Sequence, residues 1–593
     1  MPLVQTLEAL LLKVRYELPV GRSGVPAPCL PQRDPHPNKR ALALDVIRSL
    51  YSYLPQDRRF NSLAPIAIAD QFPFWENYGL SWALPFLPTY LRALADTELK
   101  KAWWGLRALL GAPVDKMKAF RRLFSRLFDL PPPPEVERWR EDGFFARNRV
   151  DGPNPLLLAR VRSIDELQAT IPITEEQYRT VMGPSHTLAD DLAAGNLFIT
   201  DYRVLQRSLI PQTSSRRDSR WRGKYLPCPV ALFCQRPGVD AFCELVPVAI
   251  ACDQKDAAAP NPLYLRSDEE RWLLAKTFVE AAEFNLQAMS VHLFRHHYSA
   301  EPFALTTRRQ LSPTHPIYVL LEPHIAYTLA VNNSAFHLMN TPGSVFDEIY
   351  AGELCETRQI MITSYETWTI NDMALEHDLD ARGVSEQPKE YPYRDDARLW
   401  LPVLERFVND YLQQFYHGIN DIPSDWELQA WARELQAPDG GNLRGLFAGD
   451  RLSSVPELAR VLTQFLFMAG PGHAAVHYPQ TDYFTFIPAF PGAPIMPPPE
   501  HETVTPHRII DTLPPVNVAA DQFENNQIAN YRYDRFGDYD HYPLGKVAVA
   551  KDAIARLHAG LAEIQATITE RNRTRPRPYQ YLLPSLVPNS INI

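Results

Sequence analysis

Two apolar stretches of this sequence carry histidines at spacings that could hold a metal ion. The first, FNLQAMSVHLFRHHYSAEPF at residues 284–303, has His292 and His297 five positions apart, with Gln287 one such step earlier. Residues five apart in an ideal α-helix diverge by about 140°, so they share a face only where the helix is widened into a π-bulge. The spacing alone is therefore a weak indication of a metal site, and histidines satisfied by core partners are the alternative.

The second stretch strengthens the metal hypothesis. LTQFLFMAGPGHAAVHYPQTDYF, residues 462–484, holds His473 and His477, which at four positions apart share a helix face and can bind one ion. No HExxH motif is present, so the general base of a metalloprotease is missing. Two buried helices that both offer imidazole predict a metal held between helices. Nitrogen and oxygen donors without thiolate favour iron, manganese or zinc.

The elements that must position these residues are mainly helical. The segment 271–297 is apolar nearly all round, which predicts a helix buried in the core of a large domain. Between about 195 and 265, short runs rich in Val, Ile, Phe and Tyr predict a few strands. Residues 98–110 and 117–130 have helical periodicity and are basic and aromatic; they either dock on the core or contact a lipid surface. The sequence thus predicts a mainly α protein with a minor sheet.

Composition sets further bounds. The chain has 593 residues, is 45% hydrophobic and 22% charged, and carries a net charge of -9, which predicts a globular protein and argues against nucleic-acid binding. Its six cysteines form no CxxC pair, which favours reduced thiols. The opening MPLVQTLEALLLKVRYELPV is interpreted as an amphipathic helix and not as a signal peptide. With no long apolar run, a cytoplasmic location is expected.

Several motifs, in order, resemble those of the lipoxygenases, the non-haem iron dioxygenases of polyunsaturated fatty acids. They are WREDGFFARNRVDGPNP (139–155), GNLFITDY (195–202), WLLAK (272–276), EPFALTTRRQLSPTHPIYVLLEPH (301–324), YPYRDDARLW (391–400), ELQAW (427–431), HAAVH (473–477) and the terminal NSINI (589–593). The resemblance implies one large helical catalytic domain with a minor β-sheet at residues 131–593. Residues 1–130 are then a helical extension packed on it, in place of the N-terminal β-sandwich of plant and animal members.

The resemblance also implies a ligand set for one non-haem iron per chain, with manganese as the alternative. The expected metal ligands and catalytic residues are Gln287, His292, His473, His477 and the terminal carboxylate of Ile593. Gln480 is expected to orient the His477 side of the site, and His297 is expected outside the first coordination shell.

Gln287 is the main departure, because it stands where the resemblance places the first ligating histidine. Four interpretations are open: its amide oxygen ligates, water takes the position, tight metal binding is lost, or His292 and His297 form the pair instead. Two further departures concern loops. Gly-Pro-Gly at 470–472 predicts a broken or kinked helix before His473. Thr341 after Asn340 stands where the resemblance places a small residue of the substrate and oxygen pocket, so the position and stereochemistry of oxygenation cannot be carried over; the alternative is that Thr341 is only a loop residue.

The function implied is an oxidoreductase that inserts dioxygen into a polyunsaturated fatty acid or similar lipid, giving a hydroperoxide of the oxylipin class. The alternatives are a hydroperoxide isomerase or non-standard oxidase on the same scaffold, and a metal-poor lipid-binding pseudoenzyme. We further expect a monomer that binds no nucleic acid and makes at most peripheral contact with membranes.

Overall fold

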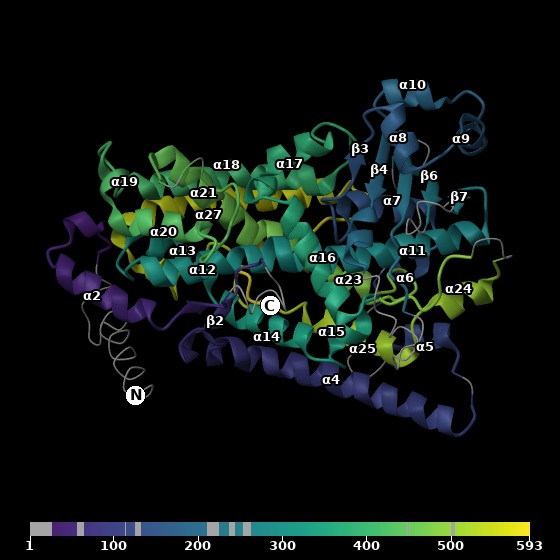
Figure 1. Ribbon diagram of the computed structural model, residues 1–593, viewed down its shortest axis with the longest axis horizontal. Helices are drawn as coiled ribbons and strands as arrows, with labels where there is room; N and C mark the ends of the chain where they lie inside the picture. Colours follow the sequence, from purple (N-terminus) through teal and green to yellow (C-terminus); the bar gives the residue numbers. More distant parts are fainter. Residues whose placement is uncertain are drawn as a thin grey trace.

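The computed structural model confirms a mainly α-helical fold with one small sheet (Figure 1). It describes residues 27–55, 65–112, 114–124, 132–133, 135–209, 224–236, 244–252, 262–447, 449, 451–499 and 504–593. The predicted amphipathic helix at the start of the chain lies outside these residues. A single large hydrophobic core extends through the helical region, and a smaller cluster lies beside the sheet.

The sheet has five antiparallel strands in sequence order, which stand at the upper right of Figure 1. They are β3 (Ala159–Arg160), β4 (Leu197–Asp201), β5 (Val230–Gln235), β6 (Leu245–Ala251) and β7 (Leu263–Leu265). The three apolar runs predicted as strands became β4, β5 and β6. Every residue of β5 and β6 is buried because helices cover one face of the sheet and the main core covers the other. A separate two-stranded ribbon joins β1 (Ser52–Tyr53) to β2 (Ala69–Gln71).

Helices make up most of the rest of the described chain. The longer ones are α2 (Pro37–Arg48), α4 (Leu80–Leu109), α5 (Lys116–Arg122), α7 (Asp142–Asp151), α8 (Ile164–Thr170), α9 (Glu175–Met182), α11 (Glu270–Leu286), α12 (Ser299–Gln310), α13 (Pro316–Ile325), α14 (Thr328–Asn340), α16 (Leu354–Thr367), α17 (Leu375–Arg382), α18 (Pro392–Leu412), α20 (Trp426–Gln436), α21 (Val455–Phe467), α24 (Pro506–Thr512), α25 (Val516–Ile528) and α27 (Lys551–Asn572). The shorter ones are α6 (Glu135–Arg138), α10 (Leu188–Ala193), α15 (Val345–Ile349), α19 (Asp421–Ser424), α22 (His473–His477), α23 (Pro479–Phe484) and α26 (Pro543–Lys546).

The central helix is buried along nearly its whole length, as its apolar sequence predicts. Its few charged residues are paired inside the core. Lys276 donates to the Asp142 carboxylate at 2.8 Å, and Glu280 forms an ion pair with Arg149 of α7. Removing one partner of such a buried pair leaves an uncompensated charge, so these contacts lock α7 against α11.

The N-terminal part contains one helix longer than the sequence predicts. α4 begins at Leu80, well before residue 98, and continues through Pro85 and Pro88 to Leu109. The second predicted helix, 117–130, corresponds to α5, which ends at Arg122; residues 125–130 lie outside the described part. α4 packs along α25 and forms the lower edge of the molecule in Figure 1.

Two sequence expectations concern solvent and redox state. Within the described residues, no helix is both long enough and apolar enough to span a membrane. Cys29, Cys228, Cys234, Cys252 and Cys355 are all free thiols, while Cys243 lies outside the described part.

Candidate metal centre

The first histidine pair lies on a widened stretch of helix. α11 runs directly into a π-helix, Gln287–Tyr298 (η5), which α12 continues. A π-helix bonds each N–H to the carbonyl five residues earlier, so residues five apart come to lie near one another on one face. His292 and His297 therefore lie on one face of the widened helix, as a metal site with this five-residue spacing requires.

The second pair follows another π-helix. α21 continues through Met468–Gly472 (η7) into α22, and α23 follows. The predicted break at Gly-Pro-Gly is wrong: the helix is widened there and still reaches His473 and His477. A widened turn accommodates Pro471, whose missing N–H would cost a hydrogen bond in a regular helix. Gly470 is required by packing, since a Cβ there would lie 2.7 Å from the Phe536 ring.

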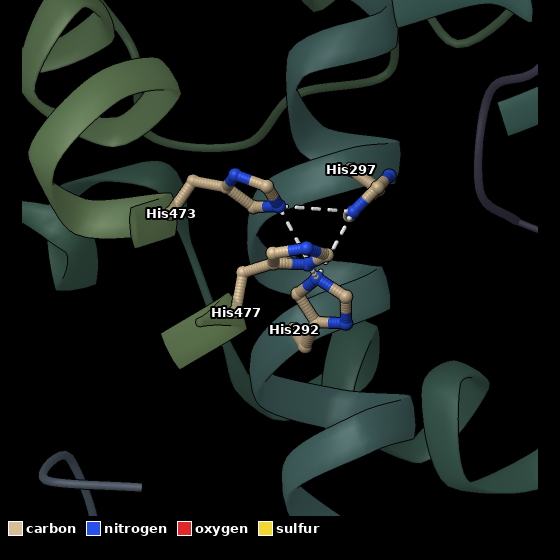
Figure 2. A group of neighbouring side chains, drawn as sticks. All are labelled: His292, His297, His473 and His477. Atoms are coloured by element: carbon tan, nitrogen blue, oxygen red, sulfur yellow. Dashed lines mark hydrogen bonds between the residues drawn. The ribbon is translucent and has the colours of Figure 1, made fainter. Parts of the chain in front are cut away.

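Four imidazoles from these two helices converge in the core (Figure 2). Nε2 of His292 lies 3.2 Å from Nε2 of His473 and 3.1 Å from Nε2 of His297. Nδ1 of His477 lies 2.8 Å from the same His292 atom. One ring nitrogen from each residue falls within 4.8 Å of all the others, and all four side chains are buried. Convergent nitrogen lone pairs of this kind are a ready cation site.

Burial keeps these imidazoles neutral. It lowers the pKa of His297 to about 4, and it lowers the pKa of His477 to about 3 together with the nearby His297. The pKa values of His292 and His473 lie well below the usual range for the same reason, with a further lowering by neighbouring histidines. Neutral imidazole is the form that ligates metal.

A hydrogen-bond chain fixes which nitrogen of His297 faces the group. Its Nδ1 lies 2.9 Å from Oδ1 of Asn332, while the Asn332 amide nitrogen donates to Glu301 at 2.8 Å and to the His297 carbonyl at 2.7 Å. These two acceptors require the amide oxygen to face the ring, so Nδ1 carries the proton. The lone pair of Nε2 is therefore directed into the group.

His477 is oriented the opposite way round. Its Nε2 lies 2.6 Å from the carbonyl oxygen of Ala529, an acceptor that requires the proton on Nε2. Nδ1 is then unprotonated and faces His292. The Ala529 carbonyl, in the backbone after α25, thus fixes the tautomer of His477 as Asn332 fixes that of His297.

Gln480 contacts a different histidine from the one expected. Its amide nitrogen lies 3.1 Å from Nδ1 of His292, not beside His477. Because amide oxygen and nitrogen exchange by a simple flip, the same side chain can accept from the Nδ1–H that a metal-ligating His292 requires.

Gln287 was expected as a ligand and His297 outside the ligand set, and the structure brings His297 into the group of imidazoles. The long π-helix explains this, because it brings residues 292 and 297 to the same point. The Gln287 amide nitrogen donates to the Val476 carbonyl at 2.6 Å, and its buried Oε1 has no hydrogen-bond partner. The ligand role of Gln287 stays a prediction.

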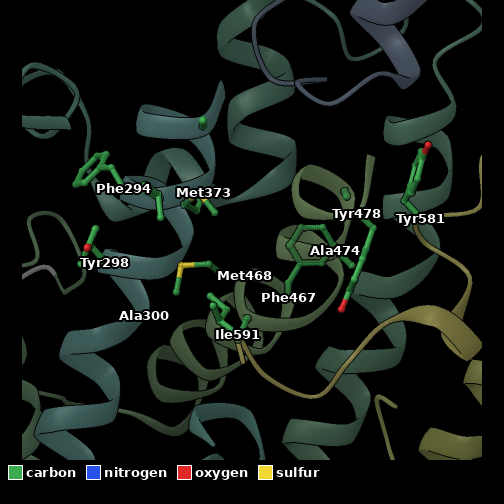
Figure 3. Close-up of a cluster of buried hydrophobic side chains, with 14 of the residues drawn as sticks. Phe294, Tyr298, Ala300, Met373, Phe467, Met468, Ala474, Tyr478, Tyr581 and Ile591 are labelled. Carbon is green, nitrogen blue, oxygen red and sulfur yellow. The ribbon is translucent and has the colours of Figure 1, made fainter. Parts of the chain in front are cut away.

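The C-terminal tail is threaded into the protein. Asn589, Ser590, Ile591 and Asn592 are all buried. Their backbone is held from several directions: the Trp82 indole donates to the Asn592 carbonyl at 3.1 Å, and Thr328 donates to that of Ile591 at 3.1 Å. Figure 3 shows Ile591 beside Met468 and Phe467 of the second helix. Four buried residues tied in this way leave the Ile593 carboxylate little freedom.

The expected substrate and oxygen pocket residues lie elsewhere. Thr341 is exposed, and its hydroxyl donates to the His337 carbonyl at 2.8 Å. Asn340 ends α14, bonded to the Phe336 carbonyl and to Arg358. An exposed hydroxyl that closes a helix end does not line a buried pocket, so the prediction for Thr341 is not supported by its position.

Sequence reasoning missed Asn332 and Glu301, which orient His297. Both had a recognisable signal. Asn332 occupies the buried face of α14 together with Leu329 and Met339, three or more positions to either side. A polar residue at a core position of an apolar helix needs a partner, and the nearby histidines were the obvious candidates.

The fold and the site together define a class: a mainly helical protein with a buried imidazole cation site between two π-widened helices. Comparison with known sequences gives the family. The sequence model of the lipoxygenases matches residues 124–518, and the chain belongs to this family.

Relatives and solved structures agree with that assignment. The Pseudomonas aeruginosa linoleate 9/13-lipoxygenase is 33% identical over 86% of this chain and 74% of its own length. A human hydroperoxide isomerase, ALOXE3, is 32% identical over 77% of this chain and 63% of its own length. The structure of a calcium-dependent 11R-lipoxygenase superposes with a TM-score of 0.83 at 26% identity, over 96% of this chain and 83% of that one. The resemblance drawn from the motifs is confirmed.

Proposed function

We propose that this chain is a metal-dependent dioxygenase that converts a polyunsaturated fatty acid and dioxygen into a lipid hydroperoxide. The observation that supports it is the group of four buried neutral imidazoles, carried on a lipoxygenase fold. The relative from Pseudomonas aeruginosa is named for linoleate, which makes linoleate the first substrate to supply.

The donor set fits a redox-active ion. We assign His292, His297, His473 and His477 as ligands, with the Ile593 carboxylate completing the set. Imidazole with carboxylate suits iron or manganese, and iron is the choice that the family favours. When bound, such an ion would supply the one-electron chemistry that removes a hydrogen atom from a bis-allylic carbon.

The protein's own residues prepare that chemistry in three ways. Asn332 and the Ala529 carbonyl hold the protons of His297 and His477 on the outer nitrogens. The apolar core around both helices keeps bulk water from the imidazoles and so keeps them neutral. The anchored tail restricts the terminal carboxylate, which we assign as the anionic ligand that such an ion needs besides imidazole.

A second candidate is the hydroperoxide isomerase reaction, because the human isomerase is as similar to this chain as the dioxygenase relatives are. It would consume a supplied fatty-acid hydroperoxide without net uptake of dioxygen. Oxygen consumption with linoleate would indicate the dioxygenase. Loss of diene absorbance from a supplied linoleate hydroperoxide would indicate the isomerase.

The deciding experiment compares variants at two positions of η5, ten residues apart. Metal content by plasma mass spectrometry and dioxygen uptake with linoleate are measured for His297→Ala and Gln287→Ala. We expect His297→Ala to lose both metal and activity, and Gln287→Ala to keep the metal. The opposite result would restore Gln287 as the ligand. A wild-type protein that binds no metal after reconstitution with ferrous iron would instead be a lipid-binding pseudoenzyme.

The proposal also covers the assembly and location of the chain. The chain acts as a monomer. Its location is the cytoplasm, in keeping with the free thiols of the described cysteines. Residues 1–130 form a helical extension, and residues 131–593 form the catalytic domain. The packing of α4 along α25 supports an extension that is fixed to the catalytic part.

A further inference from the structure

The outer face of α4 is the most apolar exposed surface in the described part of the chain. Ten of the sixteen exposed large hydrophobic side chains there belong to this helix or its C-cap. They are Leu80, Leu84, Leu87, Tyr90, Leu91, Leu99, Trp103, Leu106, Leu109 and Leu110. Their spacing of mostly three or four residues places them along one side of a helix. An apolar stripe of this length on a soluble surface marks an interaction site.

The opposite face of α4 fixes the helix to the body of the protein. Trp82, Thr97 and Trp104 are buried against it. Lys101 forms an ion pair with Asp521 of α25, and the Trp82 indole holds the C-terminal tail. α4 lies along one edge of the molecule over its whole length (Figure 1). The inner side of α4 therefore packs on the protein, and the apolar stripe on its outer side faces solvent.

The charge around this helix has the opposite sign to the rest of the chain. Residues 80–122 contain eight Lys or Arg and three Asp or Glu, whereas the whole chain carries a net charge of -9. On α5, directly after α4, the side chains of Lys118 and Arg121 are 75% and 53% exposed, and they form solvent-exposed ion pairs with Asp115 and Glu137, which contribute little and can exchange for lipid phosphate. An apolar stripe with cations beside it matches an anionic lipid surface, where both contributions favour binding.

A hollow lies beside the stripe. Between α4 and α25 there is a cavity of about 630 Å³. Trp104, Ala108 and Val516 supply apolar walls. Lys101, which is paired with Asp521, and Lys116, which donates to the carbonyls of Ile510 and Leu513, also line the cavity. The size and the apolar lining suit an acyl chain.

We propose that the outer face of α4, with this hollow, docks the protein on anionic phospholipid membranes, with α4 lying in the plane of the interface. A second copy of the chain is a poorer occupant. A two-fold interface through this stripe would bring the same basic segment against itself, and like charges oppose such a contact. The docking does not depend on the proposed dioxygenase activity, although a lipid substrate would be found at the same surface.

The test is sedimentation of the purified full-length protein with vesicles. Phosphatidylcholine vesicles with and without phosphatidylglycerol are compared for wild type, for Leu84→Ser/Leu91→Ser/Leu106→Ser and for Ile419→Ser. Ile419 is 90% exposed and lies beside α19, far from α4, which makes it a matched apolar control. We expect wild type and Ile419→Ser to bind anionic vesicles, and the triple variant to bind at least about tenfold more weakly.

Two further measurements locate the contact. Brominated lipids in the same vesicles should quench wild-type tryptophan fluorescence, and Trp103→Phe should remove most of that quenching while binding persists. Lys118→Glu/Arg121→Glu should lower affinity for anionic vesicles and leave the weak binding to neutral ones unchanged. Thermal unfolding and metal content of every variant show whether the fold and the proposed catalytic site are intact.

Three outcomes would overturn the proposal. The first is that wild type fails to sediment with anionic vesicles while remaining a monomer. The second is that the triple variant binds as well as wild type. The third is that wild type forms a dimer, which the triple variant disperses, and binds no vesicles; a second copy is then the occupant. None of these results bears on metal content or dioxygen uptake, so they leave the proposed function to its own test.

Discussion

The two helices that supply the imidazoles bring them to the same point by different geometries. The first places His292 and His297 five residues apart and has its π-helix between and around them, at Gln287–Tyr298. The second has its π-helix ahead of its histidines, at Met468–Gly472, and carries His473 and His477 on an ordinary α-helical turn. In the first helix the π-helix sets the distance between His292 and His297. In the second, the π-helix sets only the direction of the regular α-helical turn that carries His473 and His477.

This difference predicts different consequences of damage. A change that disturbs the support of η5 alters how two imidazoles face one another, so it should act first on metal affinity. A change in η7 leaves the spacing of His473 and His477 intact but disturbs the packing of the whole turn, so it should act first on stability. The predictions below test this division, from the largest expected effect to the smallest.

Acid should destabilise the metal-free protein, because protons bind the buried imidazoles of both helices once the protein unfolds. The folded pKa of His297 is about 4, below the ordinary value of 6.5, so its contribution to stability is present above pH 6.5 and lost as pH falls toward 4. That loss is about 3 kcal/mol for His297 alone. Urea unfolding of chelator-treated protein between pH 7 and 4 measures it.

Two variants control the acid experiment. His297→Leu removes one of the buried titrating groups and should reduce the pH dependence by the share of that group, and His377→Ala, at an exposed histidine, is the matched control. Metal-loaded protein should keep its stability to lower pH because the ion competes with protons. A metal-free protein equally stable at pH 7 and pH 5 would show that the imidazoles are not held neutral by burial.

Gly470→Ala tests the second helix. The added Cβ would lie 2.7 Å from the ring of Phe536, which is itself buried and packs edge-on against Trp400. We expect a loss of about 1–3 kcal/mol in the free energy of unfolding. Thermal or urea unfolding measures it. Once loaded, the variant should hold its metal nearly as well as wild type.

The matched control for Gly470→Ala is Gly105→Ala on α4, where a Cβ meets nothing within 4 Å. That change should stabilise the protein by up to about 1 kcal/mol through helix propensity. If Gly470→Ala instead lost metal with no change in stability, η7 would be as closely coupled to ligand geometry as η5 is, and the comparison would fail.

Asn332→Ala tests the first helix. It removes the acceptor for the Nδ1–H of His297, so the ring can rotate or change tautomer. Loss of such an outer hydrogen bond typically costs about 10–100-fold in metal affinity. Competition with a chelator measures it. Ser334→Ala, at an exposed position of the same helix, is the control. Unchanged affinity would mean that the π-helix alone orients His297.

The sequence predicted much of this arrangement, and His297 is the one histidine of the group that it placed outside the ligand set. The buried central helix, the strands β4–β6 and three of the four histidines followed from periodicity, composition and motif. The condition for His292 and His297 to share a face was also recognised. The resemblance nevertheless placed Gln287 among the ligands and His297 outside them, because the motifs WLLAK and EPF on either side of this helix align without a gap.

Two other features could not be predicted for a more general reason. The Ala529 carbonyl that orients His477 is a backbone atom, and any residue there would supply it. The widened turn packs at Gly470 against Phe536 and the Pro588 carbonyl of the tail, which approach from more than sixty residues away. The Gly-Pro-Gly sequence predicted a broken helix because these contacts come from residues that are distant in the chain.

The smallest effect is expected from the tail. Trp82→Phe removes the indole N–H that donates to the Asn592 carbonyl, but it keeps the ring stacked on Tyr78 at a centroid distance of 3.8 Å. One hydrogen bond contributes about 1 kcal/mol, so metal should be lost to a chelator roughly fivefold faster if Ile593 is a ligand. Trp103→Phe, at an exposed tryptophan of the same helix, should release metal at the wild-type rate. Equal rates for all three proteins would mean that the terminal carboxylate does not help to hold the ion, and that the imidazoles of the two helices bind it unaided.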